Sequence, residues 1–106
     1  LHAAGQAREE VARGERVAIS PAARLYAILD VDLISARGWA PLDVADAWLE
    51  AGVRLIQLRA KALRSGSLQQ LADALVARAH AAGALVLIND RADIAALSGA
   101  DGVHVG

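Results

Sequence analysis

The sequence contains no cysteine and few aromatic residues. The first feature limits the chemistry open to the protein, and the second limits the composition of its core. Without cysteine the chain cannot form disulfides, use a thiolate nucleophile or bind zinc through sulfur. Only 3% of its 106 residues are aromatic, with one tyrosine and no phenylalanine. Its core must therefore come from Ala, Leu, Val and Ile, which favours helices packed on a sheet. The lack of cysteine also favours a cytoplasmic location.

Charge and hydropathy give no sign of a nucleic-acid or membrane partner. The net charge is −1 and no basic run occurs, so we expect no binding to nucleic acid. No apolar run approaches the roughly 20 residues of a membrane span, and the N-terminus lacks the apolar centre of a signal peptide. We therefore expect a soluble protein with one small domain.

The chain divides into an N-terminal segment and a domain with alternating strands and helices. Residues 1–20 are rich in Ala, Arg, Glu and Gly, and we expect a flexible extension before a domain of residues 21–106. Within that domain, apolar stretches predict buried strands over residues 25–30, 53–61, 84–89 and 103–105. Since the chain starts at Leu1 and stops just after the last strand, we expect it to be a fragment of a larger domain.

Helices are predicted between these strands. Pro41 and Asp43 mark a helix start, and Gly52 its end. Ser67 and Gln70 form a capping box at the start of a second helix, which stops at Gly83. A short helix follows over residues 90–97, while the polar residues of 30–38 predict a loop.

The two Ala-Gly pairs that precede the second and third strands are 31 residues apart, at residues 51–52 and 82–83. This period indicates successive βα units, which imply parallel strands covered by helices. An open doubly wound sheet also fits, but no Gly-x-Gly-x-x-Gly motif follows any strand. Polar residues gather instead at strand ends, where a (βα)8 barrel builds its active site. We therefore predict an α/β fold: about four strands, the first half of such a barrel.

The second strand carries polar residues at alternate positions, Gln57, Arg59 and Lys61. Side chains alternate between the faces of a strand, so these three share one face. An amide and two cations at a strand end suit a phosphate or diphosphate. The alternative is a solvated strand end with extended charged side chains. Lys61 is the only lysine, against ten arginines.

Four motifs together resemble the thiamin phosphate synthase family. They are Leu25-Tyr-Ala-Ile-Leu-Asp30, Gln57-Leu-Arg-Ala-Lys61, Ile88-Asn-Asp-Arg91 and Gly102-Val-His-Val-Gly106. Their order and spacing match the family over residues 25–106, each at a predicted strand end. The resemblance implies a (βα)8 barrel for thiamin biosynthesis. That enzyme joins hydroxymethylpyrimidine diphosphate to a thiazole phosphate and releases diphosphate with the help of Mg²⁺.

The resemblance also implies roles for individual residues. Gln57, Arg59 and Lys61 would bind the diphosphate of the pyrimidine substrate, and Arg59 and Lys61 would also act in catalysis by stabilising it as it leaves. Asn89 would contact the pyrimidine or the diphosphate. Asp90 would be a Mg²⁺ ligand, although its type and place also suit a helix N-cap.

Parts of the family pattern lie beyond the residues of this chain. The second Mg²⁺ carboxylate follows the segment that matches Gly102–Gly106, and the loops for the thiazole phosphate come from later strands. Two alternatives to a synthase therefore stay open: a thiazole tautomerase of the same fold, and a non-catalytic half-barrel. A half-barrel would expose sheet edges that favour self-association.

Overall fold

The computed structural model describes residues 26–106. The predicted extension, residues 1–20, and the first residues of the predicted domain lie outside this described part. No helix in the described part is both long and apolar enough to span a membrane.

Four strands alternate with helices along the described chain. The strands are β1 (Tyr26–Asp30), β2 (Leu55–Arg59), β3 (Leu85–Asn89) and β4 (Gly102–His104). The helices are α3 (Val31–Ala36), α4 (Pro41–Ala51), α5 (Ser65–Ala81) and α6 (Ala92–Ser98). The four predicted strands are confirmed, although β2 ends before Lys61.

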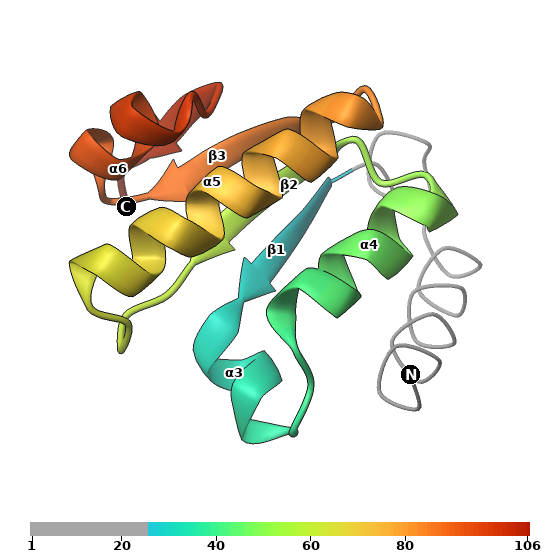
Figure 1. Ribbon diagram of the computed structural model, residues 1–106, viewed down its shortest axis with the longest axis horizontal. Coiled ribbons are helices and arrows are strands. Elements are labelled where there is room, and N and C mark those ends of the chain that lie inside the picture. The colour runs from blue at the N-terminus through green and yellow to red at the C-terminus, as the bar shows by residue number, and fades with distance from the viewer. Residues whose placement is uncertain (1–25) are drawn as a thin grey trace.

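The four strands form one parallel sheet in the order β1-β2-β3-β4, and the arrows of β1, β2 and β3 point the same way in Figure 1. Each strand thus pairs with the next one in the chain. A doubly wound sheet reverses its strand order at a switch point, whereas a barrel adds strands sequentially. The observed order therefore favours the predicted half-barrel over the doubly wound alternative.

Each of the four described helices is followed within two residues by a glycine whose backbone adopts a left-handed conformation. These glycines are Gly38, Gly52, Gly83 and Gly99, with φ between 74° and 105°. The residue after each glycine donates a backbone hydrogen bond to the carbonyl five residues earlier, as Val53 does to Trp48 at 2.9 Å. This is the Schellman closure, which turns the chain back toward the next strand. The 31-residue period in the sequence reflects this repeated turn.

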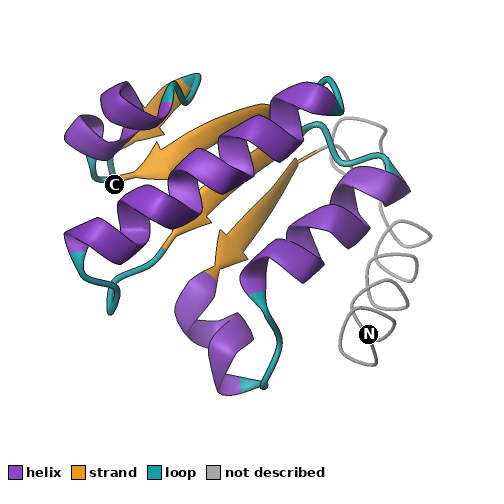
Figure 2. Ribbon diagram, in the orientation of Figure 1, coloured by secondary structure: helices purple, strands orange, loops and turns teal. Residues whose placement is uncertain are grey.

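The core lies on one face of the sheet. Its buried members are all Ala, Val, Leu or Ile, and Trp39 and Trp48 pack at its margin. Helices α4, α5 and α6 contact the strands on this side, as the purple ribbons of Figure 2 show. The opposite face, which would line a closed barrel, leaves apolar side chains exposed: Tyr26 by 39%, Ile28 by 45% and Leu85 by 52%.

Two local predictions were wrong. Residues 31–36 form helix α3 rather than a loop, because the Asp30 carboxylate caps the helix by accepting a 3.1 Å hydrogen bond from the backbone of Leu33. Helix α5 begins at Ser65 rather than after a capping box at Ser67. Its first turn closes when the backbone N–H of Leu68 donates to the carbonyl of Arg64 at 2.9 Å.

Candidate functional site

A hollow of about 250 Å³ opens on the face of the sheet that no helix of residues 26–106 covers, which we call the uncovered face, toward the carboxyl ends of the strands. All four strands contribute to it, as do the segments that follow β2, β3 and β4. Its lining is Tyr26, Ile28, Gln57, Arg59, Lys61, Asn89, Asp90, His104 and Gly106. All five residues predicted from the sequence as site residues are among them, so the fold brings them together.

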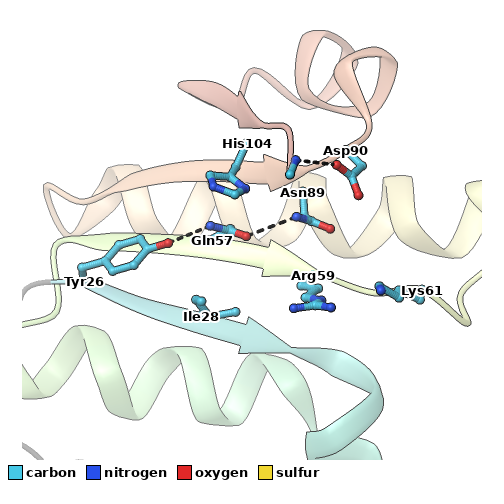
Figure 3. A pocket seen from close by; sticks show the side chains of 9 residues that line it. Tyr26, Ile28, Gln57, Arg59, Lys61, Asn89, Asp90 and His104 are labelled. Atoms are coloured by element: carbon cyan, nitrogen blue, oxygen red, sulfur yellow. Dashed lines mark hydrogen bonds between the residues drawn. The ribbon is translucent and has the colours of Figure 1, made fainter.

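A row of hydrogen-bonded side chains crosses three strands at the floor of the hollow (Figure 3). The Gln57 amide nitrogen donates to the hydroxyl of Tyr26 at 2.7 Å. The Gln57 amide oxygen accepts from the amide of Asn89 at 3.4 Å. Gln57 is only 3% exposed, so these partners satisfy a polar group that would be costly to bury alone. Because both of its ends are engaged, the row fixes the orientation of Gln57.

Arg59 and Lys61 stand beyond this row, at the end of β2 and just after it (Figure 3). Arg59 is half-buried and Lys61 is exposed. Within residues 26–106, no carboxylate forms an ion pair with either side chain. Two cations without an internal counterion leave the hollow suited to an anion that can accept several hydrogen bonds.

Asp90 has a left-handed backbone, with φ of 61°, uncommon outside glycine but tolerated by Asp and Asn. It is not the cap of the following helix, because α6 begins at Ala92 and its N-cap is Arg91, so that alternative is wrong. The backbone of Asp90 donates to the carbonyl of His104 at 2.8 Å, and its carboxylate accepts from Gly106 at 3.3 Å. These contacts hold an exposed carboxylate at the rim of the hollow.

The rim of the hollow provides one carboxylate, Asp90, that could bind a magnesium ion. No group of three or more Asp, Glu, His or Cys residues gathers anywhere in residues 26–106. Mg²⁺ commonly binds proteins through one or two carboxylates together with substrate phosphates and water. Asp90 therefore fits a Mg²⁺ ion that arrives with a phosphate, and does not fit a cage built by protein ligands alone.

Four lining residues and one neighbour were not predicted as site residues: Tyr26, Ile28, His104 and Gly106 line the hollow, and Asp32 lies beside it. Tyr26 and Ile28 line the hollow because they are in parallel register with Leu55 and Gln57 on the same face. The alternation of strand β1 could have revealed both. The contact of Asp32 with the loop after β2, at 3.1 Å from the Lys61 amide, spans 29 residues and leaves no local sequence signal.

Two histidines lie in very different places. His104 lines the hollow from β4, above Gln57 in Figure 3. His80, at the far end of α5, binds the carboxylate of Asp101 at 2.8 Å. That hydrogen bond holds the pKa of Asp101 below its usual value. This pair joins α5 to the segment before β4 and takes no part in the hollow.

Comparison with known proteins bears on the family resemblance seen in the sequence. The model of the family described as thiamine monophosphate synthase matches residues 25–106. No solved structure matches the chain.

Three curated relatives are thiamine-phosphate synthases. The chain is 50% identical to the one from Chlorobium luteolum over 66 residues, which are 62% of this chain and 31% of the relative. It is 41% identical to that of Herpetosiphon aurantiacus over 83 residues, 78% of this chain and 39% of the relative. Identity to the Thermus thermophilus protein is 43% over 72 residues, 65% and 35% of the two chains. The chain thus spans about a third of the length of these relatives.

Proposed function

This chain belongs to the thiamine monophosphate synthase family, and on that premise we propose that it carries the diphosphate-binding part of a thiamin phosphate synthase. The proposed substrates of the whole enzyme are hydroxymethylpyrimidine diphosphate and a thiazole phosphate. The proposed products are thiamin phosphate and diphosphate. A cytoplasmic location and the absence of nucleic-acid and membrane partners remain part of this proposal.

One observation carries the proposal: Arg59 and Lys61 line the same hollow as Asn89 and Asp90, with no ion pair to a carboxylate of residues 26–106. An amide donor, a guanidinium and an ammonium can together bind several oxygens of a diphosphate. The hollow, of about 250 Å³, opens on the face that a closed barrel would enclose. In a barrel enzyme, substrates bind at the carboxyl ends of the strands, and the hollow opens toward these ends.

The proposed chemistry is substitution at the methylene carbon of the pyrimidine. The bond from that carbon to the diphosphate oxygen breaks, and the diphosphate leaves with the electron pair. The thiazole nitrogen then supplies its lone pair to form the new carbon–nitrogen bond. No protein nucleophile is needed, so Arg59 and Lys61 would act by stabilising negative charge on the leaving group.

Asp90 would hold Mg²⁺ against the bound diphosphate. The ion, when bound, would supply further positive charge to the leaving oxygens. Asp90 is suited to this because Gly106 and His104 fix its backbone and carboxylate at the rim. The remaining ligands would be phosphate oxygens and water.

A thiazole tautomerase is the second candidate of the same fold. It would not need a complete diphosphate site, so Arg59 and Lys61 together favour the synthase. A non-catalytic half-barrel is the third candidate, favoured by the exposed apolar face of the sheet. Binding of inorganic diphosphate separates the first candidate from the other two.

The test is calorimetric titration of the purified chain with inorganic pyrophosphate in the presence of Mg²⁺. We expect Lys61→Ala and Arg59→Ala each to weaken binding about ten- to a hundredfold, the usual effect of losing a charge-assisted contact. Orthophosphate should bind more weakly than pyrophosphate, because it occupies only part of the site. Circular dichroism on each variant verifies that the helices are retained.

Arg64→Ala is the matched control. Arg64 is an exposed cation in the same loop, three residues after Lys61, and it does not line the hollow. Its removal should change pyrophosphate affinity less than twofold. Affinity that is unchanged in Lys61→Ala and Arg59→Ala, or reduced equally in Arg64→Ala, would reject the proposed site.

A further inference from the structure

Asp32 connects the first turn of α3 to the loop that carries Lys61. One carboxylate oxygen accepts a hydrogen bond from the backbone N–H of Lys61 at 3.1 Å, and the other from that of Ala62 at 3.4 Å. Asp32 itself does not line the hollow. It therefore contacts the backbone of a site residue from outside the site.

Asp32 supplies the hydrogen bonds that join the loop between β2 and α5 to the rest of the described fold. Within the described part of the chain, the two bonds to Asp32 are the only hydrogen bonds that residues 60–63 make to another element of the fold. The Lys61 side chain is exposed and has four rotatable carbon–carbon bonds. Without a fixed backbone, its ammonium would sample many positions besides the hollow.

Helix α3 is itself fixed at this point. The Asp30 carboxylate caps it through Leu33 at 3.1 Å, and Val31 and Ile34 bury its inner side. Ala60 and Leu63, at the two ends of the loop, pack against the core, whereas Lys61 and Ala62 between them are exposed. Asp32 thus extends from a packed and capped turn to the exposed middle of the loop. Asp32 therefore links the backbone of Lys61 to a helix that is itself fixed by β1 and the core.

We propose that Asp32 is a positioning residue for Lys61, acting through the backbone of the loop to place the ammonium over the bound anion. This inference rests on the proposed function, because it requires that Lys61 binds the anion. It assigns to Asp32 a role that its negative charge alone would not suggest.

The sign of the effect separates positioning from simple electrostatics. A carboxylate next to an anion site repels the anion, so removing Asp32 should tighten binding if charge alone mattered. If Asp32 positions Lys61, its removal should weaken binding instead. Because the two carboxylate oxygens contact two N–H groups, Asp32→Asn keeps one acceptor and should retain part of the effect.

The experiment is a double-mutant cycle on the purified chain, with inorganic pyrophosphate as the probe and calorimetry as the readout. We expect Asp32→Ala to weaken binding about three- to tenfold, the range of one or two hydrogen bonds, and Asp32→Asn to weaken it less. In the Lys61→Ala background, Asp32→Ala should change affinity less than twofold. Asp43→Ala removes a carboxylate from the first turn of α4 and is the control for charge and for helix starts.

Hydrogen exchange by mass spectrometry adds a readout that requires no ligand. Asp32→Ala should speed exchange in a peptide that covers residues 60–63, whereas Asp43→Ala should not. Tighter or unchanged pyrophosphate binding in Asp32→Ala, with weaker binding in Lys61→Ala, would overturn the inference and leave the proposed function standing. An equal loss for Asp32→Ala in both backgrounds would also overturn it, as a general structural effect. Unchanged binding in Lys61→Ala would reject the proposed function and this inference with it.

Discussion

The amide of Gln57 donates a 2.7 Å hydrogen bond to the hydroxyl of Tyr26, its neighbour across strands β1 and β2. Gln57 is the one polar residue of the described part that is almost fully buried, at 3% exposure. Its amide oxygen accepts a hydrogen bond from the side-chain amide of Asn89. Tyr26 therefore sets which way the amide of a candidate substrate-binding residue faces.

Tyr26→Phe should lower the free energy of unfolding by about 1 to 3 kcal/mol, because it leaves a buried amide N–H without its partner. Urea denaturation followed by circular dichroism measures this change. In a Gln57→Leu background the same substitution should have almost no cost, since no amide remains to be satisfied. An equal loss in both backgrounds would mean that the Tyr26 hydroxyl acts elsewhere.

Asp90→Asn should leave stability nearly unchanged, because Asn also tolerates a left-handed backbone and can accept the bond from Gly106. The substitution should nevertheless abolish most of the gain in pyrophosphate affinity that Mg²⁺ provides, since a hard cation prefers a carboxylate. The measurement is titration with and without Mg²⁺. Asp43→Asn is the control for loss of one negative charge, and an equal Mg²⁺ gain in Asp90→Asn and the parent would exclude Asp90 as a ligand.

The pair of Asp101 and His80 should make stability depend on acid pH. The hydrogen bond from His80 lowers the pKa of Asp101, and the backbone of Val86 adds a bond of 2.8 Å. A carboxylate with a lowered pKa in the folded state stabilises the fold above its unfolded pKa, about 3.9. That contribution is lost as pH falls through the lower folded value.

We therefore expect Asp101→Asn to flatten the decline of unfolding free energy below about pH 4. Urea denaturation at a series of pH values gives this slope. Asp73→Asn provides a comparison, because Asp73 is an exposed carboxylate on α5 whose one side-chain hydrogen bond within residues 26–106 is accepted from Gln69. If Asp101→Asn left the acid slope as steep as in the parent, the coupling to His80 would not contribute to stability.

The uncovered face of the sheet should make the purified chain self-associate. Apolar side chains on this face are exposed, such as Leu85 at 52% exposure. Their burial against a second copy of the chain is favourable because it removes apolar surface from water. Leu85→Ser should shift the sedimentation profile toward the monomer. Leu97→Ser, on helix α6 and 74% exposed, removes a leucine from a helix and should leave the profile unchanged. A monomeric parent chain at micromolar concentration would contradict this expectation.

Sequence reasoning predicted those parts of the fold that depend on local patterns. Gly52 and Gly83 mark helix ends through their own conformational freedom, and the alternation of Gln57 with Arg59 follows from strand geometry. Helix α3 was missed because polar residues such as Asp30 suit both a loop and a helix cap. Only the tertiary arrangement, with Ile34 buried, decides between them.

The residues of the site likewise fall into those that the sequence predicts and those that only the folded structure reveals. Arg59 and Lys61 were predicted from their alternate positions at a strand end, whereas Asn89 was predicted through the resemblance to the family. The contacts of Asp32 with the loop and of Tyr26 with Gln57 join residues about 30 positions apart, and no spacing rule along one element predicts them. Such contacts are set by strand register and by loop path, which appear only once the chain is folded.

The most direct test of the account is an NMR titration of the ¹⁵N-labelled chain with inorganic pyrophosphate and Mg²⁺. The account predicts that the largest amide shifts occur at the strand ends around the hollow, at Arg59, Lys61, Asn89 and Asp90 (Figure 3). Lys61→Ala should reduce these shifts at the same ligand concentration, whereas Arg64→Ala should not. Shifts confined to the helical face, or none at millimolar pyrophosphate, would contradict the claim that this face of the sheet binds diphosphate.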